Sequence, residues 1–185
     1  MDHEAYTEQV IETMRKLDLE KVRELVEMLR DARSGDSSIY IFGNGGSGAA
    51  ASHFAEDVGK MTIPDYDKPQ GRFRIMSLTD NTPYILCLGN DLGYDQIFSQ
   101  QLMNLGREGD VAIGISGSGN SENVVLALKA ARDMGMKTAA LVGYDGGRIK
   151  GMVDLAVHVP SMDMQVCEDL HMHIIHHVVK ALCDN

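Results

Sequence analysis

The chain has 185 residues, the usual size of one domain, and 44% hydrophobic and 24% charged residues, as in ordinary soluble globular proteins. Its formal net charge is −10, from 17 basic and 27 acidic residues. This balance argues against nucleic acid as the main partner, because phosphate backbones require clustered Lys and Arg. No apolar run approaches the ~20 residues needed to span a bilayer, and the first ten residues lack a signal-peptide pattern. We therefore expect a cytoplasmic protein with no membrane partner.

Residues 1–36 predict two amphipathic helices. Their apolar stripes are Tyr6, Val10, Met14 and Leu17 in the first, and Val22, Leu25, Val26 and Leu29 in the second. Both helices precede the first predicted strand, so they cannot be crossovers of a sheet. We expect them either to pack on another subunit, as an oligomerisation segment, or to cover the core of their own chain.

Residues 37–185 predict a doubly wound α/β core, and no linker separates them from the first segment, so 1–185 is expected to form a single domain. Five short apolar runs predict strands at 38–42, 73–78, 111–116, 138–143 and 154–159. Helical segments are expected at 47–60, 94–105, 121–134, 147–152 and 163–182. Near-continuous apolar strands that alternate with helices predict a five-stranded parallel sheet covered on both faces. Ligands of such folds bind at the carboxyl ends of the strands.

A glycine-rich loop, Gly43-Asn44-Gly45-Gly46-Ser47-Gly48, follows the first strand. Glycine lets the backbone approach a ligand closely, and the helix that follows offers unpaired N–H groups. The loop lacks the Lys of a P-loop, and its spacing differs from that of the dinucleotide fingerprint. A second loop, Ser116-Gly117-Ser118-Gly119-Asn120-Ser121, follows the third strand and offers three hydroxyls. Together the two loops predict a phosphoester site that uses hydrogen bonds and helix dipoles instead of basic side chains.

Acid–base residues lie near the first loop and in the last helix. His53 and Asp57 share one face of a helix, about two turns beyond the loop. The last helix carries Glu168 and four histidines, of which His176 has apolar neighbours that predict partial burial. Two histidines and two carboxylates are also the ligand types of a mononuclear Zn²⁺ site, provided that the two helices meet.

These motifs carry a family resemblance. The segments GNGGSGAAASHFAEDV, SLTDN, GNDLGYDQIFSQQL, REGDVAIGISGSGNSENVVLAL, GYDGG and EDLHMHIIHHVV resemble those of the sugar isomerase (SIS) domain family. Within it the chain is similar to the phosphoheptose isomerases, which interconvert sedoheptulose 7-phosphate and a heptose 7-phosphate in heptose biosynthesis. The resemblance spans roughly residues 38 to 180.

The resemblance implies a homotetramer of flavodoxin-like subunits with active sites between subunits and, often, a zinc ion. By its motifs, phosphate is held by residues matching Ser47, Ser116, Ser118 and Ser121, and Asn44 and Asp91 line the sugar. The glycines Gly45, Gly46 and Gly117 belong to the same binding loops. The implied catalytic residues are Asp57, Glu168 and His176, and the implied zinc ligands are His53, Asp57, Glu168 and His176.

Two positions depart from the family pattern. Asp57 stands where the family has a glutamate, and Glu168 stands where it usually has a glutamine. Both departures retain or add oxygen ligands and negative charge, so they favour tighter binding of a cation.

The sequence therefore predicts aldose–ketose isomerisation of a sugar phosphate through an enediol. Asp57 or Glu168 exchanges the carbon-bound proton, and His176 acts as the opposite acid or base. The alternatives are another phosphosugar isomerase or lyase, a non-catalytic sugar-phosphate sensor, and a structural assembly protein.

Overall fold

A computed structural model describes residues 2–184, so positions 1 and 185 of the predicted domain lie outside the described residues. The core is one five-stranded sheet in which every neighbouring pair is parallel. In the order β2-β1-β3-β4-β5, its strands are β1 (Ser38–Gly43), β2 (Arg74–Ser77), β3 (Val111–Ser116), β4 (Lys137–Val142) and β5 (Leu155–His158). This is the flavodoxin-like order, and the switch point lies between β1 and β3. The predicted doubly wound sheet is confirmed.

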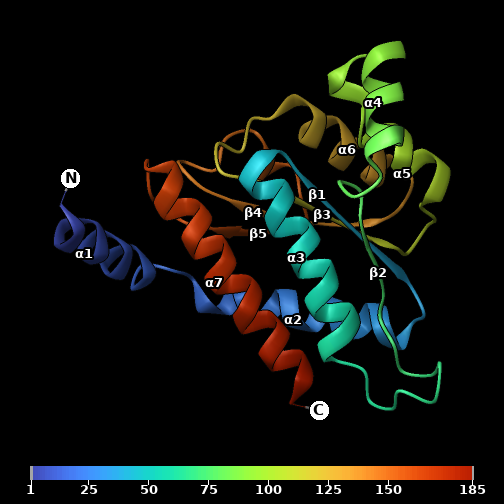
Figure 1. The fold of residues 1–185 in the computed structure, drawn as a ribbon, viewed down its shortest axis with the longest axis horizontal. Helices are drawn as coiled ribbons and strands as arrows, with labels where there is room; N and C mark the ends of the chain where they lie inside the picture. Colours follow the sequence, from blue (N-terminus) through green and yellow to red (C-terminus); the bar gives the residue numbers. More distant parts are fainter. Residues whose placement is uncertain (1, 185) are drawn as a thin grey trace.

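Helices cover both faces of the sheet (Figure 1). Alternate strand residues point to opposite faces, so Ile39 and Ile41 join one apolar cluster and Tyr40 and Phe42 join the other. The first cluster includes α2 (Leu19–Ser34), α3 (Gly45–Met61) and α7 (Met164–Cys183). The second lies under α4 (Thr82–Asp91), η1 (Tyr94–Gln96), α5 (Ser99–Leu105), α6 (Glu122–Asp133) and η2 (Ile149–Gly151). The two covered faces leave the carboxyl ends of β1 and β3 as the place for a ligand.

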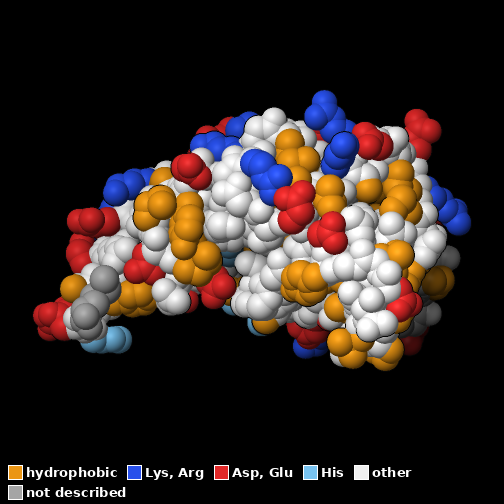
Figure 2. Space-filling view, turned by 90° about the horizontal axis from the view of Figure 1, so that it is seen from above, with side chains coloured by type: hydrophobic (Ala, Val, Ile, Leu, Met, Phe, Trp, Pro, Cys, Tyr) orange, Lys and Arg blue, Asp and Glu red, His pale blue; other side chains and the backbone are white. Residues whose placement is uncertain are grey.

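The two N-terminal helices differ in how they pack. Helix α2 buries Val22, Leu25, Val26, Leu29 and Ala32, so it covers the core of its own chain, which was one of the two expectations. Helix α1 (His3–Met14) projects from the body as an arm (Figures 1 and 2). The Tyr6 hydroxyl donates to Asp169 of α7 at 2.6 Å, and this hydrogen bond raises the pKa of Tyr6 to about 12.

The predicted set of helices requires three corrections. Helix α4 was not predicted, although Asn81 caps it and Pro83 lies in its first turn, both recognised helix-start signals. The predicted helix at 94–105 is instead a 3₁₀ turn and the short helix α5, separated by the buried residues Ile97 and Phe98. The predicted helix at 147–152 is the 3₁₀ turn η2. Among the described residues, no helix is long and apolar enough to cross a lipid bilayer.

Candidate active site

The first glycine-rich segment is mostly the first turn of α3, because the helix begins at Gly45 instead of at the predicted Ser47. Gly43 must be glycine, since a Cβ there would lie 2.8 Å from the Ile115 carbonyl oxygen and 2.9 Å from the backbone of Ser47. Asn44 precedes the helix, but its side chain makes no capping hydrogen bond. The first N–H groups of α3 are therefore not satisfied by that side chain.

The second segment turns from β3 into α6. The Ser116 and Ser121 hydroxyl oxygens lie 3.2 Å apart, and Ser121, which precedes α6, makes no capping hydrogen bond with its side chain. The Asn120 amide donates to the Ser118 carbonyl oxygen at 2.9 Å. Gly119 has φ +64, and a Cβ there would overlap the carbonyl oxygen of Gly146. The turn thus needs glycine both for its backbone conformation and for its packing.

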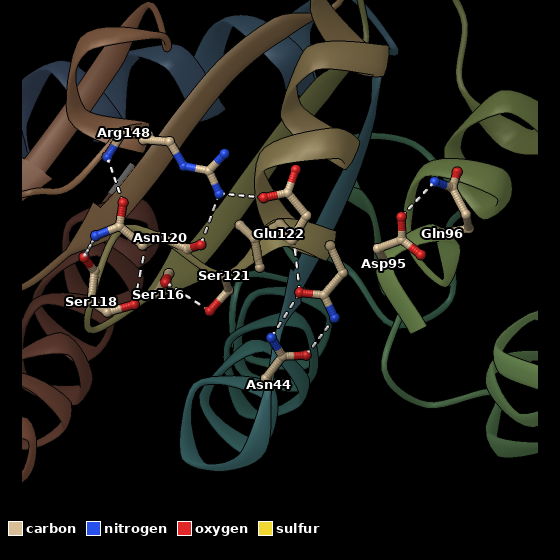
Figure 3. Close-up of polar contacts among 11 residues, drawn as sticks. Asn44, Asp95, Gln96, Ser116, Ser118, Asn120, Ser121, Glu122 and Arg148 are labelled. Atoms are coloured by element: carbon tan, nitrogen blue, oxygen red, sulfur yellow. Dashed lines mark hydrogen bonds and ion pairs between the residues drawn. The ribbon is translucent and has the colours of Figure 1, made fainter. Parts of the chain in front are cut away.

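A third segment, residues 143–148, supports this turn from the end of β4. The backbone N–H of Arg148 donates to Asn120 Oδ1 at 3.1 Å, and its Nη2 donates to the Asn120 carbonyl oxygen at 3.0 Å. The same guanidinium forms an ion pair with Glu122, as Figure 3 shows. The Ile149 N–H donates to the Gly119 carbonyl oxygen at 3.1 Å. The two segments therefore hold each other in place.

The two helix starts face one pocket of about 270 Å³. Its lining residues are Asn44, Gly45, Gly46, Ser47, Ile115, Ser116, Gly117, Ser118, Ser121, Met164 and Glu168. The set includes every residue predicted for phosphate binding except Asp91, which ends α4 and accepts a hydrogen bond from Asn90. A larger cavity, about 730 Å³, lies along β2 and includes neither predicted loop. The smaller pocket has the donors that an ester dianion requires.

Glu168 is the one charged residue among those lining this pocket. Its carboxylate lies beside the first turn of α3, so close that a Cβ on Gly46 would lie 2.5 Å from Oε1. A carboxylate is stabilised at a helix N-terminus by the helix dipole. It also places a negative charge where a phosphate is expected to bind.

Helices α3 and α7 run side by side in the same direction (Figure 1). Gly46 lies beside Glu168 near their starts, and the Cys183 thiol donates to the Met61 carbonyl oxygen at their ends. His53 and His176 meet between these contacts, with ring centroids 5.2 Å apart. The two predicted helices therefore do meet.

A compact acid–base group forms at this meeting point. His53 Nε2 lies 3.2 Å from Asp57 Oδ2 and 3.4 Å from His176 Nε2, and His176 Nε2 lies 3.9 Å from Asp57 Oδ2. The side chain of Asp57 is 14% exposed, whereas those of His53 and His176 are 47% and 55% exposed. The group thus combines one sheltered carboxylate with two accessible imidazoles.

The expected partial burial of His176 is wrong, and His171 is the buried histidine of α7. His171 is 1% exposed, and neither ring nitrogen has a well-aligned hydrogen-bond partner. Burial lowers the pKa of His171 to about 4, and the Val142 backbone only partly opposes this shift. The apolar neighbours of His176 in sequence point to the core, while the ring itself points away from it.

The same three residues fit a divalent metal ion. Their ligand atoms all lie within 4.8 Å of one another, and tetrahedral ligands at zinc-to-ligand distances of ~2.0–2.1 Å are ~3.3 Å apart. The observed separations of 3.2, 3.4 and 3.9 Å are close to that value. Glu168, the fourth predicted ligand, is not part of this group, and its carboxylate lies at the phosphate pocket.

Sequence reasoning missed three residues of this region. Asn123 and Tyr94 hold Asn44, which lines the pocket, and Arg148 holds Asn120 in the second loop. Asn123 follows the second loop by two positions, and Tyr94 and Arg148 lie in or beside recognised motifs. A prediction limited to ligand contacts could not find them, because they act on other side chains.

A protein-family model for the SIS domain matches residues 3–143. The chain belongs to the SIS domain family. It is 41% identical over 177 residues to a phosphoheptose isomerase of Geobacter sulfurreducens, and the match covers 95% of this chain and 89% of that protein.

Solved structures of two phosphoheptose isomerases agree with this membership. The one from Neisseria gonorrhoeae is 34% identical, with a TM-score of 0.88 over 97% of this chain and 94% of that chain. The one from Francisella tularensis is 27% identical, with a TM-score of 0.90 over 98% of this SIS-domain chain and 96% of that chain.

Proposed function

We propose that this protein is an isomerase that interconverts sedoheptulose 7-phosphate and D-glycero-D-manno-heptose 7-phosphate through an enediol. The observation that carries the proposal is one pair of helices with an anion pocket at its start and an acid–base group farther along. The relatives named phosphoheptose isomerase support this choice of substrate over other sugar phosphates.

The spacing along α3 suits a long sugar phosphate. His53 follows Ser47 by six residues, or ~9 Å along a helix. A heptulose 7-phosphate carries its ester and its carbonyl near opposite ends of the carbon chain. Phosphate bound at the helix starts therefore directs the reacting carbons toward the acid–base group and supplies binding energy remote from the reaction.

Proton transfer is assigned to Asp57 and His176. Asp57 removes the proton next to the carbonyl, and the proton returns to the adjacent carbon, while His176 exchanges the hydroxyl proton as the opposite acid or base. Glu168 was the alternative carboxylate, but it lies at the phosphate pocket, whereas Asp57 contacts both imidazoles. The geometry thus favours Asp57 as the base.

His53, Asp57 and His176 are also the residues proposed to hold Zn²⁺. A zinc ion there would polarise the carbonyl and hydroxyl oxygens as a Lewis acid. Three protein ligands leave one coordination position open, which is typical of catalytic and not structural zinc sites. Glu168, which the resemblance implied as a fourth ligand, lies at the pocket between the helix starts and not in this group within one chain.

We also propose a cytoplasmic homotetramer with active sites between subunits and with residues 1–36 contributing to assembly. Two features support it: the exposed imidazoles at the acid–base group and the projecting arm of α1. Side chains that are exposed in a single chain would be covered by a neighbouring subunit in the tetramer. Asp91, which does not line the pocket of its own chain, would contact the sugar in this arrangement.

The test is an assay of C5, C6 and C7 ketose phosphates, with the product aldose followed by NMR. The chelated protein is compared with protein to which zinc has been restored. We expect the highest kcat/KM with sedoheptulose 7-phosphate, and higher activity with zinc. Faster turnover of a different ketose phosphate would show that the proposed substrate is wrong. Phosphate binding without turnover of any ketose phosphate would indicate a sensor.

A further inference from the structure

Six of the seven α-helices in the described residues follow a residue of a capping type, and they fall into two groups. Four α-helices are capped by a side chain that accepts hydrogen bonds from their first turn, namely Asp2, Asp18, Asn81 and Asp163. Helices α3 and α6 also follow residues of a capping type, Asn44 and Ser121, but neither side chain makes a capping bond. These two are the helix starts that line the phosphate pocket.

Asn123 accounts for the missing cap of α3. The Asn44 amide donates to Asn123 Oδ1 at 2.8 Å, and the Asn123 amide donates back to Asn44 Oδ1 at 2.8 Å. Figure 3 shows the Asn44 side chain joined to the start of α6 by these bonds. The Tyr94 hydroxyl donates to the same Asn44 oxygen at 2.9 Å. An asparagine held in this way cannot accept from the N–H of Gly46 or Ser47, as a capping residue does.

Asn123 also accounts for the missing cap of α6. The Val124 N–H, in the first turn of α6, donates to Asn123 Oδ1 at 2.9 Å. The Val124 N–H is one of the donors that a Ser121 cap would use, and it is already bonded to Asn123. The Ser121 hydroxyl instead lies 3.2 Å from the Ser116 hydroxyl at the pocket. The Val124 N–H also fixes which end of the Asn123 amide is oxygen.

Asn123 itself is 2% exposed and does not line the pocket. We propose that Asn123 is a positioning residue that keeps both helix starts open for phosphate. It holds Asn44 away from α3 and replaces Ser121 as the acceptor at α6. The inference rests on the proposed function only in naming the bound anion as the phosphate of a sugar phosphate.

The first test measures binding of inorganic phosphate by calorimetry. Asn123→Ala removes two of the three hydrogen bonds that hold the Asn44 side chain, which lets Asn44 cap its own helix. We therefore expect phosphate affinity to fall about tenfold, the equivalent of one lost hydrogen bond to a charged group. The matched control is Asn104→Ala, which removes an exposed amide that donates to Tyr84. It should bind phosphate as the unmodified protein does.

A second variant separates this role from a general effect on folding. Glycine is tolerated before a helix but has no side chain that could cap it. In Asn123→Ala combined with Asn44→Gly, phosphate affinity should therefore return to about that of Asn44→Gly alone. An Asn123 that served only to stabilise the fold would give no such recovery.

Three results would overturn the inference. They are unchanged phosphate affinity in Asn123→Ala, no recovery in the double variant, and backbone amide NMR signals of Gly46 and Ser47 that do not shift when phosphate is added to the unmodified protein. If Asn123→Ala does not fold, Asn123→Ser makes the same comparison, because serine retains an acceptor for the Val124 N–H. Phosphate binding without turnover would contradict the proposed function and leave this comparison intact.

Discussion

Two regions of the α3–α7 pair, the phosphate end at its start and the acid–base end farther along, are built differently. At the phosphate end, Ser47 is 6% exposed and Ser116 is 3% exposed, and the turn after β3 is bonded to the segment after β4. At the acid–base end, His53 and His176 are about half exposed and contact mainly Asp57 and each other. The difference teaches that one chain supplies all the residues lining the pocket at the helix starts, whereas it leaves the imidazoles of the acid–base group exposed.

The largest effect is expected at the acid–base end. Separate His176→Ala and Asp57→Asn variants should each lower kcat about 1,000-fold, because a positioned general acid or base contributes ~10²–10⁴-fold. Affinity for inorganic phosphate should stay within about twofold in both, because the pocket is built by other residues. Steady-state kinetics and calorimetry measure the two quantities.

The controls are the exposed neighbours of these residues. His177→Ala removes an imidazole and Glu56→Gln removes a carboxylate charge on the same two helices, and neither residue belongs to the acid–base group. Both variants should retain nearly full turnover. Equal losses in variants and controls would remove the assignment of Asp57 and His176.

The phosphate end should be the more sensitive to packing. Gly119→Ala adds a methyl group that overlaps the Gly146 carbonyl at a residue with φ +64. Overpacking and left-handed backbone strain together should lower the free energy of unfolding by about 3 kcal/mol. Gly109→Ala is the matched control, since φ is +85 but no atom lies within 4 Å of the added Cβ. Gly109→Ala should lower the free energy of unfolding by about 1 kcal/mol. Urea unfolding measures both variants, and equal losses of stability would contradict the packing argument.

Acid sensitivity should come from His171, the buried histidine of α7. Burial lowers its pKa to about 4 in the folded chain, from the ordinary value of 6.5 that an unfolded, solvated histidine has, so the unfolded chain binds the extra proton between these values. Stability is therefore complete above pH 6.5 and falls as the pH drops toward 4, by about 3 kcal/mol in total.

The variant His171→Leu should flatten this dependence, while His173→Ala, at an exposed position of the same helix, should not. Unfolding midpoints at pH 4 to 7 measure the slopes. An unchanged slope in His171→Leu would assign the acid sensitivity to other groups. The experiment also fixes the pH range in which activity reports on the acid–base end alone.

The smallest effect concerns the negative charge in the phosphate pocket. Glu168→Gln removes the one charged side chain among the pocket-lining residues, so affinity for inorganic phosphate should rise about fivefold at low salt and less at high salt. Glu56→Gln makes the same change in net charge away from this pocket and should have little effect. Weaker phosphate binding in Glu168→Gln would show that this carboxylate supports the pocket instead of opposing the anion.

Sequence patterns predicted the strands well, because strands depend on local order, and the two loops that the sequence singled out line one pocket. All five strands lie within one or two residues of the predicted ranges, since buried parallel strands are continuous apolar runs. Helix α4, which Asn81 caps, was missed, and so was the division of 94–105 at the buried residues Ile97 and Phe98. Capping and burial decide where these helices begin, and apolar periodicity alone does not show either. The burial of His171 and the exposure of His176 depend on how α7 is rotated against the sheet, which its sequence alone did not specify.

By itself, the sequence determined the class of fold, the family and the positions of the two glycine- and serine-rich loops, since glycine spacing constrains the backbone directly. Only the tertiary structure decided which side chains from distant segments act together. It brought His53 and Asp57 to His176, and left Glu168 at the other end of the helix pair. It also joined Asn44 to Asn123 across 79 positions of sequence. Such contacts arise from the packing of α3 against α7 and β1 against β3, which no local pattern specifies.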